Sequence, residues 1–289
     1  MSISGKTRLC GVIGDPIAHS LSPVIHNAAF RHLKLDFVFL AFNVKPSELE
    51  NAMRGIRGLG IHGLNVTMPL KRAVTSFLDE IDPTAKSLGV VNTILNNNGR
   101  LCGFNTDGVG ALRALKENKV PLSGKKVLLL GAGGAAKAIA LSLTREVEEL
   151  LLLNRTPKKA RELKESLNQH FGRKVTVGTF SSSVVQKYLQ DADVLINATS
   201  VGMHPNPSQS IIPREFLKTD LVVMDIVYNP VETKLVKDAR AAGARVITGV
   251  EMLIHQGAAS FEIWTGCPAP VDVMREATLS KLASSGEDR

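Results

Sequence analysis

Short apolar runs alternate with amphipathic stretches along the chain, and this alternation is the first indication of its fold. The apolar runs predict strands at residues 8–14, 37–42, 61–66, 127–130, 149–153, 175–178, 194–197, 221–225 and 245–248. The stretches with helical spacing predict helices at about residues 22–35, 46–57, 106–118, 134–143, 156–168, 231–242, 250–264 and 271–282, and further helical structure beginning at Pro69. Short continuous apolar strands separated by helices are typical of parallel sheets covered on both faces, so the pattern predicts an α/β fold.

Two polar signals add local detail to this pattern. Asn97, Asn98 and Gly99 separate the apolar runs at 90–95 and 100–104, and such spacing predicts a tight β-hairpin. Ser22 followed by Pro23 predicts a helix start in which Ser22 is the N-cap and Pro23 is the first helical residue.

Composition narrows the class of protein. A chain of 289 residues with 44% hydrophobic residues is long and apolar enough for two globular domains. The net charge of +8 is dispersed and only 4% of residues are aromatic, which disfavours nucleic-acid binding and favours a small anionic ligand. Cys10, Cys102 and Cys267 are odd in number and far apart, so we expect no disulfide scaffold and no structural zinc site. The first residues lack the apolar segment of a signal peptide, and no run reaches the roughly 18 apolar residues of a membrane span, so we expect a cytoplasmic protein.

A glycine-rich segment follows the predicted strand at 127–130. The sequence from Gly131 to Ala136 fits the pattern G-x-G-x-x-G/A, with Gly133 as the second glycine. Small residues are needed there because the chain turns sharply, backbone N–H groups approach a pyrophosphate, and the next helix packs closely on the strand. The predicted strand before it and the predicted helix after it strengthen the interpretation as a dinucleotide site.

The end of the next predicted strand indicates which dinucleotide is bound. NAD sites place an acidic residue about 20 residues beyond the first glycine, where it binds the ribose hydroxyls. Here Asn154 and Arg155 occupy that region, with Lys158 and Lys159 nearby. A carboxylate would repel a 2′-phosphate and an arginine can bind it in bidentate fashion, so the sequence predicts NADP.

Polar groups gather in three segments of the first half of the chain. Two hydroxyls stand at a predicted helix start at 20–22, and an Asn, a Thr and a Lys end the strand at 65–71. Amides, hydroxyls and a carboxylate lie on both sides of the predicted hairpin, at 91–93 and 105–108. Together these groups suit a polyhydroxylated substrate that carries a carboxylate.

Nine short motifs, taken in order, resemble the shikimate dehydrogenase family. They are GDPIAHSLSP (14–23), NVTMPLK (65–71), VNT (91–93), NTDG (105–108), GAGGA (131–135), NRT (154–156), NATSVGM (197–203), YNPV (228–231) and GVEMLIHQG (249–257). The resemblance extends over about residues 8–265, and an ordered set of this size is far more specific than any one motif.

The resemblance implies a role for individual residues. Lys71 and Asp107 would flank the reacting hydroxyl as the catalytic pair and also bind substrate, and Ser20 and Ser22 would bind the substrate carboxylate. The other implied substrate-binding residues are Asn65, Thr67, Asn92, Tyr228 and Gln256. The implied cofactor-binding residues are Gly131, Ala132, Gly133, Gly134, Ala135, Asn154, Arg155, Thr156, Lys159, Thr199, Ser200, Val201, Gly202, Met203, Ile226 and Gly249.

The resemblance also implies a domain organisation and a reaction. An N-terminal α/β substrate domain would comprise residues 1–108 and about 255–289, and a Rossmann-type NADP-binding domain would comprise about 109–254. The C-terminal helices would return to the first domain. The implied reaction is the reversible, metal-free reduction of 3-dehydroshikimate to shikimate by NADPH, which belongs to the biosynthesis of chorismate and the aromatic amino acids.

Three positions depart from the commoner family pattern, and two other functions stay open. Leu70 stands where Phe is frequent, Ile226 where Met often lines the nicotinamide, and Pro83 where an acidic residue is often found near the cofactor. One alternative is a quinate/shikimate dehydrogenase that uses NAD or NADP, and the other is a non-catalytic NADP-binding sensor. The expected partner is the small-molecule substrate rather than a nucleic acid or a membrane, and the sequence leaves a homodimer open.

Overall fold

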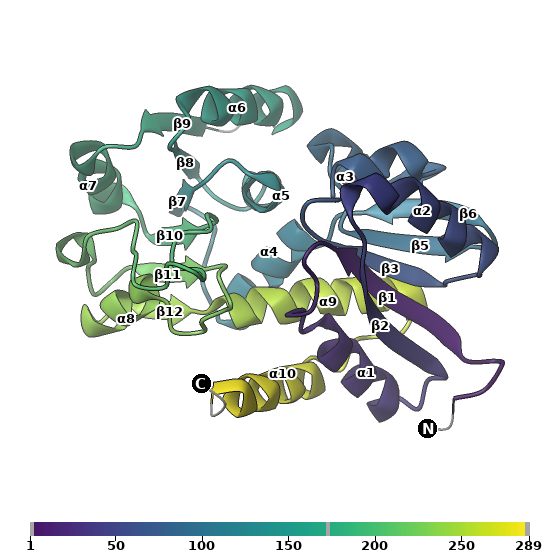
Figure 1. Cartoon of the computed structure of the whole chain (residues 1–289). Coiled ribbons are helices and arrows are strands. Elements are labelled where there is room, and N and C mark those ends of the chain that lie inside the picture. Colours follow the sequence, from purple (N-terminus) through teal and green to yellow (C-terminus); the bar gives the residue numbers. More distant parts are fainter. Residues whose placement is uncertain (1–2, 172–173, 287–289) are drawn as a thin grey trace. The chain divides into compact units, whose positions relative to one another are not determined.

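The chain folds into two compact units. The computed structural model describes residues 3–171 and 174–286. Unit 1 contains Met1–Thr106 and Ile254–Arg289, and unit 2 contains Asp107–Leu253. The chain therefore enters unit 2 immediately after Thr106 and returns to unit 1 immediately after Leu253 (Figure 1).

The sheet of unit 1 has six strands in the order β2-β1-β3-β5-β6-β4. They are β1 (Arg8–Gly14), β2 (Phe37–Asn43), β3 (Gly63–Val66), β4 (Glu80–Ile81), β5 (Thr93–Asn97) and β6 (Arg100–Phe104). β1 is parallel to both β2 and β3, but β5 is antiparallel to β3 and to β6. The hairpin predicted between 90–95 and 100–104 is confirmed as β5 and β6, with Asn98 and Gly99 both at positive φ, and β5 also pairs antiparallel with β3, so the sheet of this unit is mixed rather than parallel.

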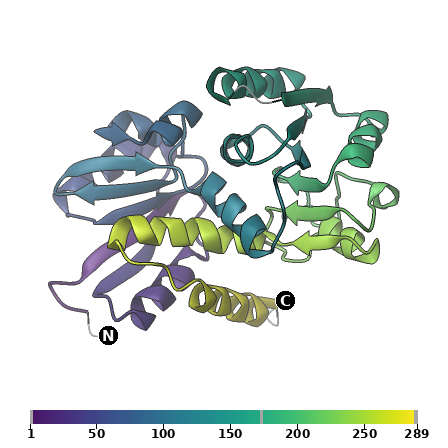
Figure 2. The ribbon, with the colours of Figure 1, turned by 180° about the vertical axis from the view of Figure 1, so that it is seen from behind.

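Helices cover both faces of this sheet. They are α1 (Ser22–His32), α2 (Leu49–Gly58), α3 (Pro83–Leu88), α10 (Val271–Gly286) and, from Ile254 onward, α9 (Gly249–Thr265), with short 3-10 helices η1 (Pro46–Glu48) and η2 (Ala73–Phe77). α1 and α10 pack side by side (Figures 1 and 2). The face opposite to α1 buries an aliphatic cluster to which α2 and η2 contribute; it includes Ile13, Leu49, Met53, Ile56, Leu64, Val66, Val74 and Ile94.

Aromatic side chains join α1 and α9 to the sheet. The ring of Phe30 in α1 lies 5.0 Å from that of Phe37 and 5.3 Å from that of Phe261 in α9. Trp264 of α9 donates its indole N–H to the carbonyl of Ile94 in β5, at 2.9 Å. Each buried aromatic pair contributes about 0.5–1.5 kcal/mol beyond its buried area, so these contacts fix α9 against the sheet.

The sheet of unit 2 is wholly parallel, with the order β12-β11-β10-β7-β8-β9. Its strands are β7 (Lys126–Leu130), β8 (Glu149–Asn154), β9 (Lys174–Thr179), β10 (Val194–Asn197), β11 (Val222–Asp225) and β12 (Arg245–Ile247). The strand order reverses between β7 and β10, as in the dinucleotide-binding Rossmann fold. The predicted α/β fold class, with a Rossmann-type unit, is confirmed.

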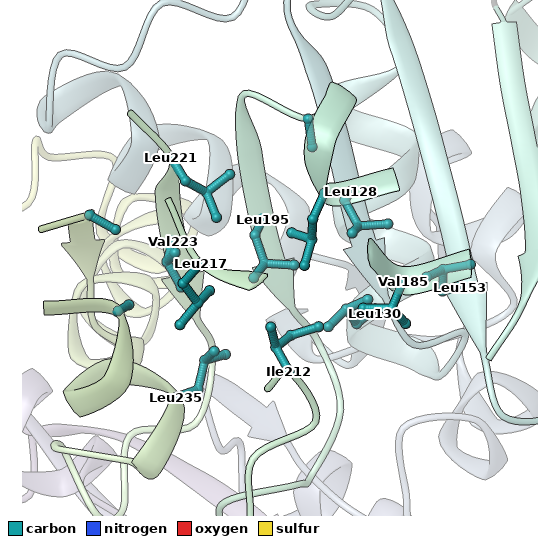
Figure 3. Close-up of a cluster of buried hydrophobic side chains, with 14 of the residues drawn as sticks. Leu128, Leu130, Leu153, Val185, Leu195, Ile212, Leu217, Leu221, Val223 and Leu235 are labelled. Atoms are coloured by element: carbon teal, nitrogen blue, oxygen red, sulfur yellow. The ribbon is translucent and has the colours of Figure 1, made fainter. Parts of the chain in front are cut away.

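Buried side chains on both faces of this sheet explain its continuous apolar strands. The helices of unit 2 are α4 (Asp107–Glu117), α5 (Gly134–Leu143), α6 (Pro157–Phe171), α7 (Ser182–Asp191) and α8 (Lys234–Ala241), with the 3-10 helix η3 (Arg214–Phe216). Leu128 and Leu130 of β7 pack in a cluster with side chains of α7 and α8 (Figure 3). Val127 and Leu129 are also fully buried, and they point to the opposite face because side chains alternate along a strand.

Most predicted elements lie where the sequence places them, with instructive exceptions. The helix predicted after Pro69 is only the 3-10 helix η2, and α2 is preceded by the 3-10 helix η1. The sequence pattern did not predict α3, α7 and the two-residue strand β4. No helix in the described ranges is long and apolar enough to cross a membrane.

Ser22 is not the N-cap of α1, contrary to prediction. The N-cap is Leu21, and Ser22 and Pro23 are the first residues of the helix. The hydroxyl of Ser20 instead accepts the backbone N–H of Ser22, at 3.3 Å. Ser20 rather than Ser22 therefore supplies a hydroxyl to a backbone N–H at the start of α1.

A close contact between α4 and α5 leads to a stability prediction. A Cβ atom on Gly108 of α4 would overlap the backbone carbonyl oxygen of Ala138 and the hydroxyl of Ser142 in α5. We expect Gly108→Ala to lower the free energy of unfolding by about 1–3 kcal/mol, because the helices must separate to admit the methyl group. Urea unfolding followed by circular dichroism measures this change.

Gly55 in α2 provides the matched control. A Cβ atom there would have no heavy atom within 4 Å, so Gly55→Ala should raise the free energy of unfolding by about 0.5–1 kcal/mol through helix propensity. If both substitutions raised stability, the close approach of α4 and α5 would be wrong.

Candidate functional site

The substrate residues predicted in unit 1 collect at one edge of its sheet. β1 and β3 are parallel neighbours, so Ser20 and Ser22 follow a strand that ends beside the one followed by Thr67 and Lys71. β5 is antiparallel to β3 and begins at the same edge, beside Asn65. Parallel strand ends are where α/β proteins place ligands, so the sheet topology brings these separate motifs to one place.

The amide group of Asn65 is held by a buried hydrogen-bond network. Its Nδ2 donates to Ser260 Oγ at 3.0 Å, to Thr93 Oγ1 at 3.3 Å and to the carbonyl of Asn92 at 3.3 Å. The hydroxyls of Thr93 and Ser260 lie 2.7 Å apart, and both residues are fully buried. With the amide nitrogen held by three acceptors, the orientation of the amide oxygen is fixed as well.

The oxygen of that amide lies in a buried setting beside His26. Asn65 Oδ1 is buried and has no well-formed hydrogen bond to any described residue. It interacts with His26 of α1, whose ring stacks on Phe39 with 4.4 Å between centroids. Burial lowers the pKa of His26 to about 3, partly opposed by Asn65, so the imidazole is neutral at physiological pH. The neutral His26 ring beside Asn65 Oδ1 therefore brings no positive charge to this part of the edge.

A second pair of bonds links the start of β5 to the segment before Asp107. Asn92 Nδ2 donates to Thr106 Oγ1 at 3.0 Å, and the backbone N–H of Thr106 donates back to Asn92 Oδ1 at 2.8 Å. Both residues are buried. This reciprocal pair fixes the last residue of unit 1, which precedes Asp107 in the chain.

The remaining predicted residues of this group are divided between the units. Lys71 is half-buried in unit 1, and Gln256 lies on α9 in the same unit, with its carbonyl accepting the hydroxyl of Ser260 at 3.0 Å. Asp107 is the first residue of α4 in unit 2 and is 5% exposed. Tyr228 also belongs to unit 2, and burial raises the pKa of its phenol above the ordinary value.

The predicted cofactor residues of unit 2 lie at the carboxyl edge of its sheet. Residues 131–135 follow β7, residues 154–156 end β8 and follow it, residues 199–203 follow β10, and Ile226 follows β11. These four strands are adjacent, and the segments after β7 and β10 flank the point where the strand order reverses. Dinucleotides bind at this point in Rossmann folds.

The glycine-rich turn has the geometry that a pyrophosphate requires. Gly131 has φ of +112°, and a Cβ atom there would come within 2.8 Å of the carbonyl oxygen of Ala198. Gly133 is the N-cap of α5 and has no capping side chain, and a Cβ atom on it would have no heavy atom within 4 Å. The side-chain position of Gly133 is therefore open, the first-turn N–H groups of α5 have no partner within the helix, and the positive end of the helix dipole favours an anion there.

The end of β8 presents a basic side chain. Asn154 is half-buried, and its Nδ2 donates to the carbonyl of Thr156 at 2.9 Å, which shapes the turn before α6. Arg155 is exposed and forms no hydrogen bond or ion pair with the described residues. Its guanidinium is therefore available to a phosphate, and Lys159 is exposed in the next helical turn.

The segment after β10 is a compact turn held by one side chain. Asn197 Oδ1 accepts the backbone N–H of Thr199 at 3.1 Å and its hydroxyl at 2.7 Å. The hydroxyl of Thr199 in turn accepts the backbone N–H of Val201 at 3.2 Å. Gly202 has φ of +92°, which lets the chain turn before Met203. Residues 199–203 thus form a shaped loop rather than a loose one.

Gly249 supports the site by packing rather than by a side chain. A Cβ atom at this position would come within 2.6 Å of the carbonyl oxygen of Ile226 and closer still to the backbone of Val227. Any other residue would push the segment after β11 out of place.

One cavity of unit 2 lies away from these residues. It has a volume of about 650 Å³ and is lined by the start of α7, residues 210–215 and the start of α8. Several of its polar groups have partners: Lys234 is paired with Asp238 at 2.8 Å, and Ser210 and Ser181 bond to the nearby backbone. The chemistry of the residues and the sheet topology both favour the carboxyl edge of the sheet, rather than this cavity, as the ligand site.

Several residues that support the site have no role assigned from the sequence motifs. Thr93, Thr106 and Asn197 stand inside the recognised motifs, beside residues that were assigned, so their position next to strand ends was an available signal. Ser260 is four residues after Gln256 on α9, and that helical spacing was a weaker signal.

Comparison with protein families covers most of the chain. Residues 12–94 match the shikimate dehydrogenase substrate binding domain, and residues 114–234 match the shikimate/quinate 5-dehydrogenase family. Residues 249–279 match the shikimate 5′-dehydrogenase C-terminal domain.

Individual relatives are similar over nearly their whole length. The NADP(+) shikimate dehydrogenase of Methanopyrus kandleri is 46% identical over 285 residues, which cover 98% of each chain. A crystal structure of shikimate dehydrogenase in complex with NADP+ has a TM-score of 0.91 and 43% identity, covering 97% of this chain and 98% of the other. The Thermus thermophilus shikimate 5-dehydrogenase in complex with NADP(H) and shikimate has a TM-score of 0.84 and 38% identity, covering 94% of this chain and 99% of the other. Since the fold, the arranged motifs and these relatives agree, the chain belongs to the shikimate dehydrogenase family.

Proposed function

We propose that this chain is an NADP-dependent shikimate dehydrogenase, which reduces 3-dehydroshikimate to shikimate and catalyses the reverse oxidation. The main support for the proposal is that one chain of this family has two sheet edges with different chemistry. The edge in unit 1 offers hydroxyls and amides for a polyhydroxylated acid. The edge in unit 2 offers a helix start and an arginine for a phosphorylated dinucleotide.

The residues of unit 2 fit NADP. The first turn of α5, with Gly131, Ala132, Gly133, Gly134 and Ala135, would hold the pyrophosphate by backbone N–H groups. Arg155 would bind the 2′-phosphate, with Asn154, Thr156 and Lys159 around it. The loop at 199–203, Ile226 and Gly249 would shape the site of the nicotinamide. The bound nicotinamide supplies the hydride in reduction and accepts it in oxidation.

The substrate residues would position the ring and move one proton. Ser20 and Ser22 would hold the ring carboxylate, and Asn65, Thr67, Asn92, Tyr228 and Gln256 would bind the ring and its hydroxyls. In reduction, the Lys71 ammonium would give its proton to the carbonyl oxygen while hydride is added to the carbonyl carbon. In oxidation, Lys71 would take that proton back, and Asp107 would hold the hydroxyls beside it.

The proposed function also implies a cellular location and a role for each domain. We place the reaction in the cytoplasm, where the three free cysteines would stay reduced. We also propose that the two domains, residues 1–108 with about 255–289 and residues 109–254, divide substrate and cofactor binding between them. Sedimentation equilibrium decides between a monomer and a homodimer.

Steady-state kinetics tests the proposed function. The rate of oxidation is measured with shikimate and with quinate, each in the presence of NADP+ and of NAD+. Shikimate with NADP+ should give the highest kcat/KM. A higher value for quinate would favour the quinate/shikimate alternative, which the matched family description includes. NADP+ binding without turnover of either acid would favour the non-catalytic sensor.

The first kinetic prediction concerns Arg155 and the choice between NADP+ and NAD+. We expect Arg155→Ala to raise the KM for NADP+ by about tenfold to a hundredfold, because a charge-assisted hydrogen bond contributes about 1.5–3 kcal/mol. The KM for NAD+ should change little, since NAD+ lacks the 2′-phosphate. Arg161→Ala is the matched control, because it removes an exposed arginine that lies on α6. It should leave the KM for NADP+ and the KM for NAD+ near wild type. Equal changes for NADP+ and NAD+ in Arg155→Ala would contradict the assignment.

Lys71 generates the prediction on the chemical step. A general acid–base group contributes about 10²–10⁴-fold, so Lys71→Ala should lower kcat by at least about a hundredfold with a modest change in the KM for shikimate. Lys71→Arg should be equally impaired, because a guanidinium does not release its proton near neutral pH. Asp107→Asn should lower kcat and raise the KM together.

The control for Lys71 is another lysine of unit 1. Lys86→Ala removes an exposed lysine from α3 and should leave kcat and KM unchanged. If Lys71→Ala kept its kcat and only raised the KM, Lys71 would be a binding residue and the proton would come from another group.

A further inference from the structure

Asp225 is a buried carboxylate that the proposed mechanism does not use. It is the last residue of β11 and is 0% exposed. Carboxylates are almost never fully buried unless they are paired, yet no cation among the described residues bonds to this one. Burial of an ionised carboxylate costs free energy unless hydrogen bonds compensate for the lost water.

Three neutral donors surround the carboxylate. Oδ1 accepts the side-chain N–H of Asn197 at 2.9 Å and the backbone N–H of Val227 at 3.1 Å. Oδ2 accepts the hydroxyl of Thr233 at 2.7 Å. Each donor comes from a different segment, so Asp225 joins the end of β10, the segment after β11 and the start of α8.

Asn197 extends the connection to the loop at 199–203. The Nδ2 group that donates to Asp225 also donates to the carbonyl of Val201, at 3.4 Å. Its Oδ1 holds both the backbone N–H and the hydroxyl of Thr199. Because Asn197 is 1% exposed and bonded at both ends of its amide, the orientation of that amide is fixed by the charge of Asp225 on one side and the loop on the other.

The other two donors reach the same region. Val227 lies between Ile226 and Tyr228, so the bond to its N–H fixes the segment that carries both side chains. Thr233 caps α8 by accepting the backbone N–H of Val236 at 3.2 Å. Its side chain also backs the loop, since a Cβ atom on Gly202 would come within 3.4 Å of it.

We propose that Asp225 is a positioning residue for cofactor binding: it holds the loop at 199–203 and the segment at 226–228 in the arrangement that the dinucleotide requires, without touching the dinucleotide itself. The proposal rests on the proposed function for the identity of the ligand. In this proposal one buried carboxylate fixes the positions of two segments relative to each other. These segments follow the neighbouring strands β10 and β11.

The charge of the carboxylate matters as well as its shape. Burial raises the pKa of Asp225 to about 6, although the bonds from Thr233, Val227 and Asn197 oppose this shift. At neutral pH the group is therefore mostly ionised and accepts all three bonds. An amide of the same shape can accept bonds at only one of its two terminal atoms and presents N–H groups at the other, so it cannot serve the three donors equally.

The variant Asp225→Asn tests the proposal, with Asp193→Asn as a matched control. Asp193 stands at the opposite, amino edge of the same sheet, where it accepts Lys125 Nζ at 2.8 Å and the backbone N–H of Lys126 at 2.9 Å. Both substitutions remove one strand-linking carboxylate charge from unit 2. Isothermal titration calorimetry gives the dissociation constant for NADP+, and thermal unfolding gives the melting temperature.

We expect Asp225→Asn to raise the dissociation constant for NADP+ by about tenfold or more, the effect of losing one hydrogen bond to a charged group. Asp193→Asn should lower the melting temperature and leave that constant within about twofold of wild type. If Asp225→Asn lowers only the melting temperature, as the control does, Asp225 is merely structural and the proposal is overturned.

If Asp225→Asn fails to fold, a second pair of variants tests the same proposal. Thr233→Val removes the hydroxyl that donates to Asp225, whereas Thr233→Ser retains it. We expect the valine variant to bind NADP+ more weakly by several-fold and the serine variant to bind it normally. Equal binding by both would overturn the proposal. The failure of the proposed function is separate, because it appears as a wild-type protein that binds NADP+ without oxidising shikimate.

Discussion

Buried polar side chains at the ends of parallel strands must bond to one another, and the arrangement of both functional edges depends on this constraint. An unsatisfied buried donor or acceptor costs about 1–3 kcal/mol, so each such group fixes its neighbours. In unit 1 the constraint joins Asn65, Thr93 and Ser260. In unit 2 it joins Asn197 and Asp225. Side chains assigned to ligand binding are thereby held by residues that are themselves fixed.

Backbone packing adds a second level of order to unit 2. Gly131 turns the chain against the end of β10, and Gly249 packs on the backbone that follows β11. Gly133 differs from both, because the space in front of it is open. Two of these glycines are thus required by the protein's own packing, whereas the third leaves room for a ligand at the start of α5. Motif patterns alone do not separate these roles.

The two units carry different chemistry on related architecture. Both place their polar groups where strands end, but the edge in unit 1 is rich in hydroxyls and amides, and the edge in unit 2 combines a helix start with an exposed arginine. The mixed sheet of unit 1 contributes to this difference. Because β5 runs antiparallel to β3, the start of the hairpin brings Asn92 and Thr93 to the edge where β3 ends.

The sequence by itself determined the α/β class, the parallel sheet of unit 2 and the glycine-rich turn, because these depend on local periodicity and on residues adjacent in the chain. The predicted helix at 134–143 coincides with α5 for this reason. The tertiary structure alone decided that Ser22 lies inside α1, that β5 pairs antiparallel with β3, and that Ser260 reaches Asn65 across 195 residues. It also decided the role of Asp225, whose burial and three donors come from segments that meet only when the strands pair. Such contacts depend on the distance between side chains in space, which local sequence patterns do not specify.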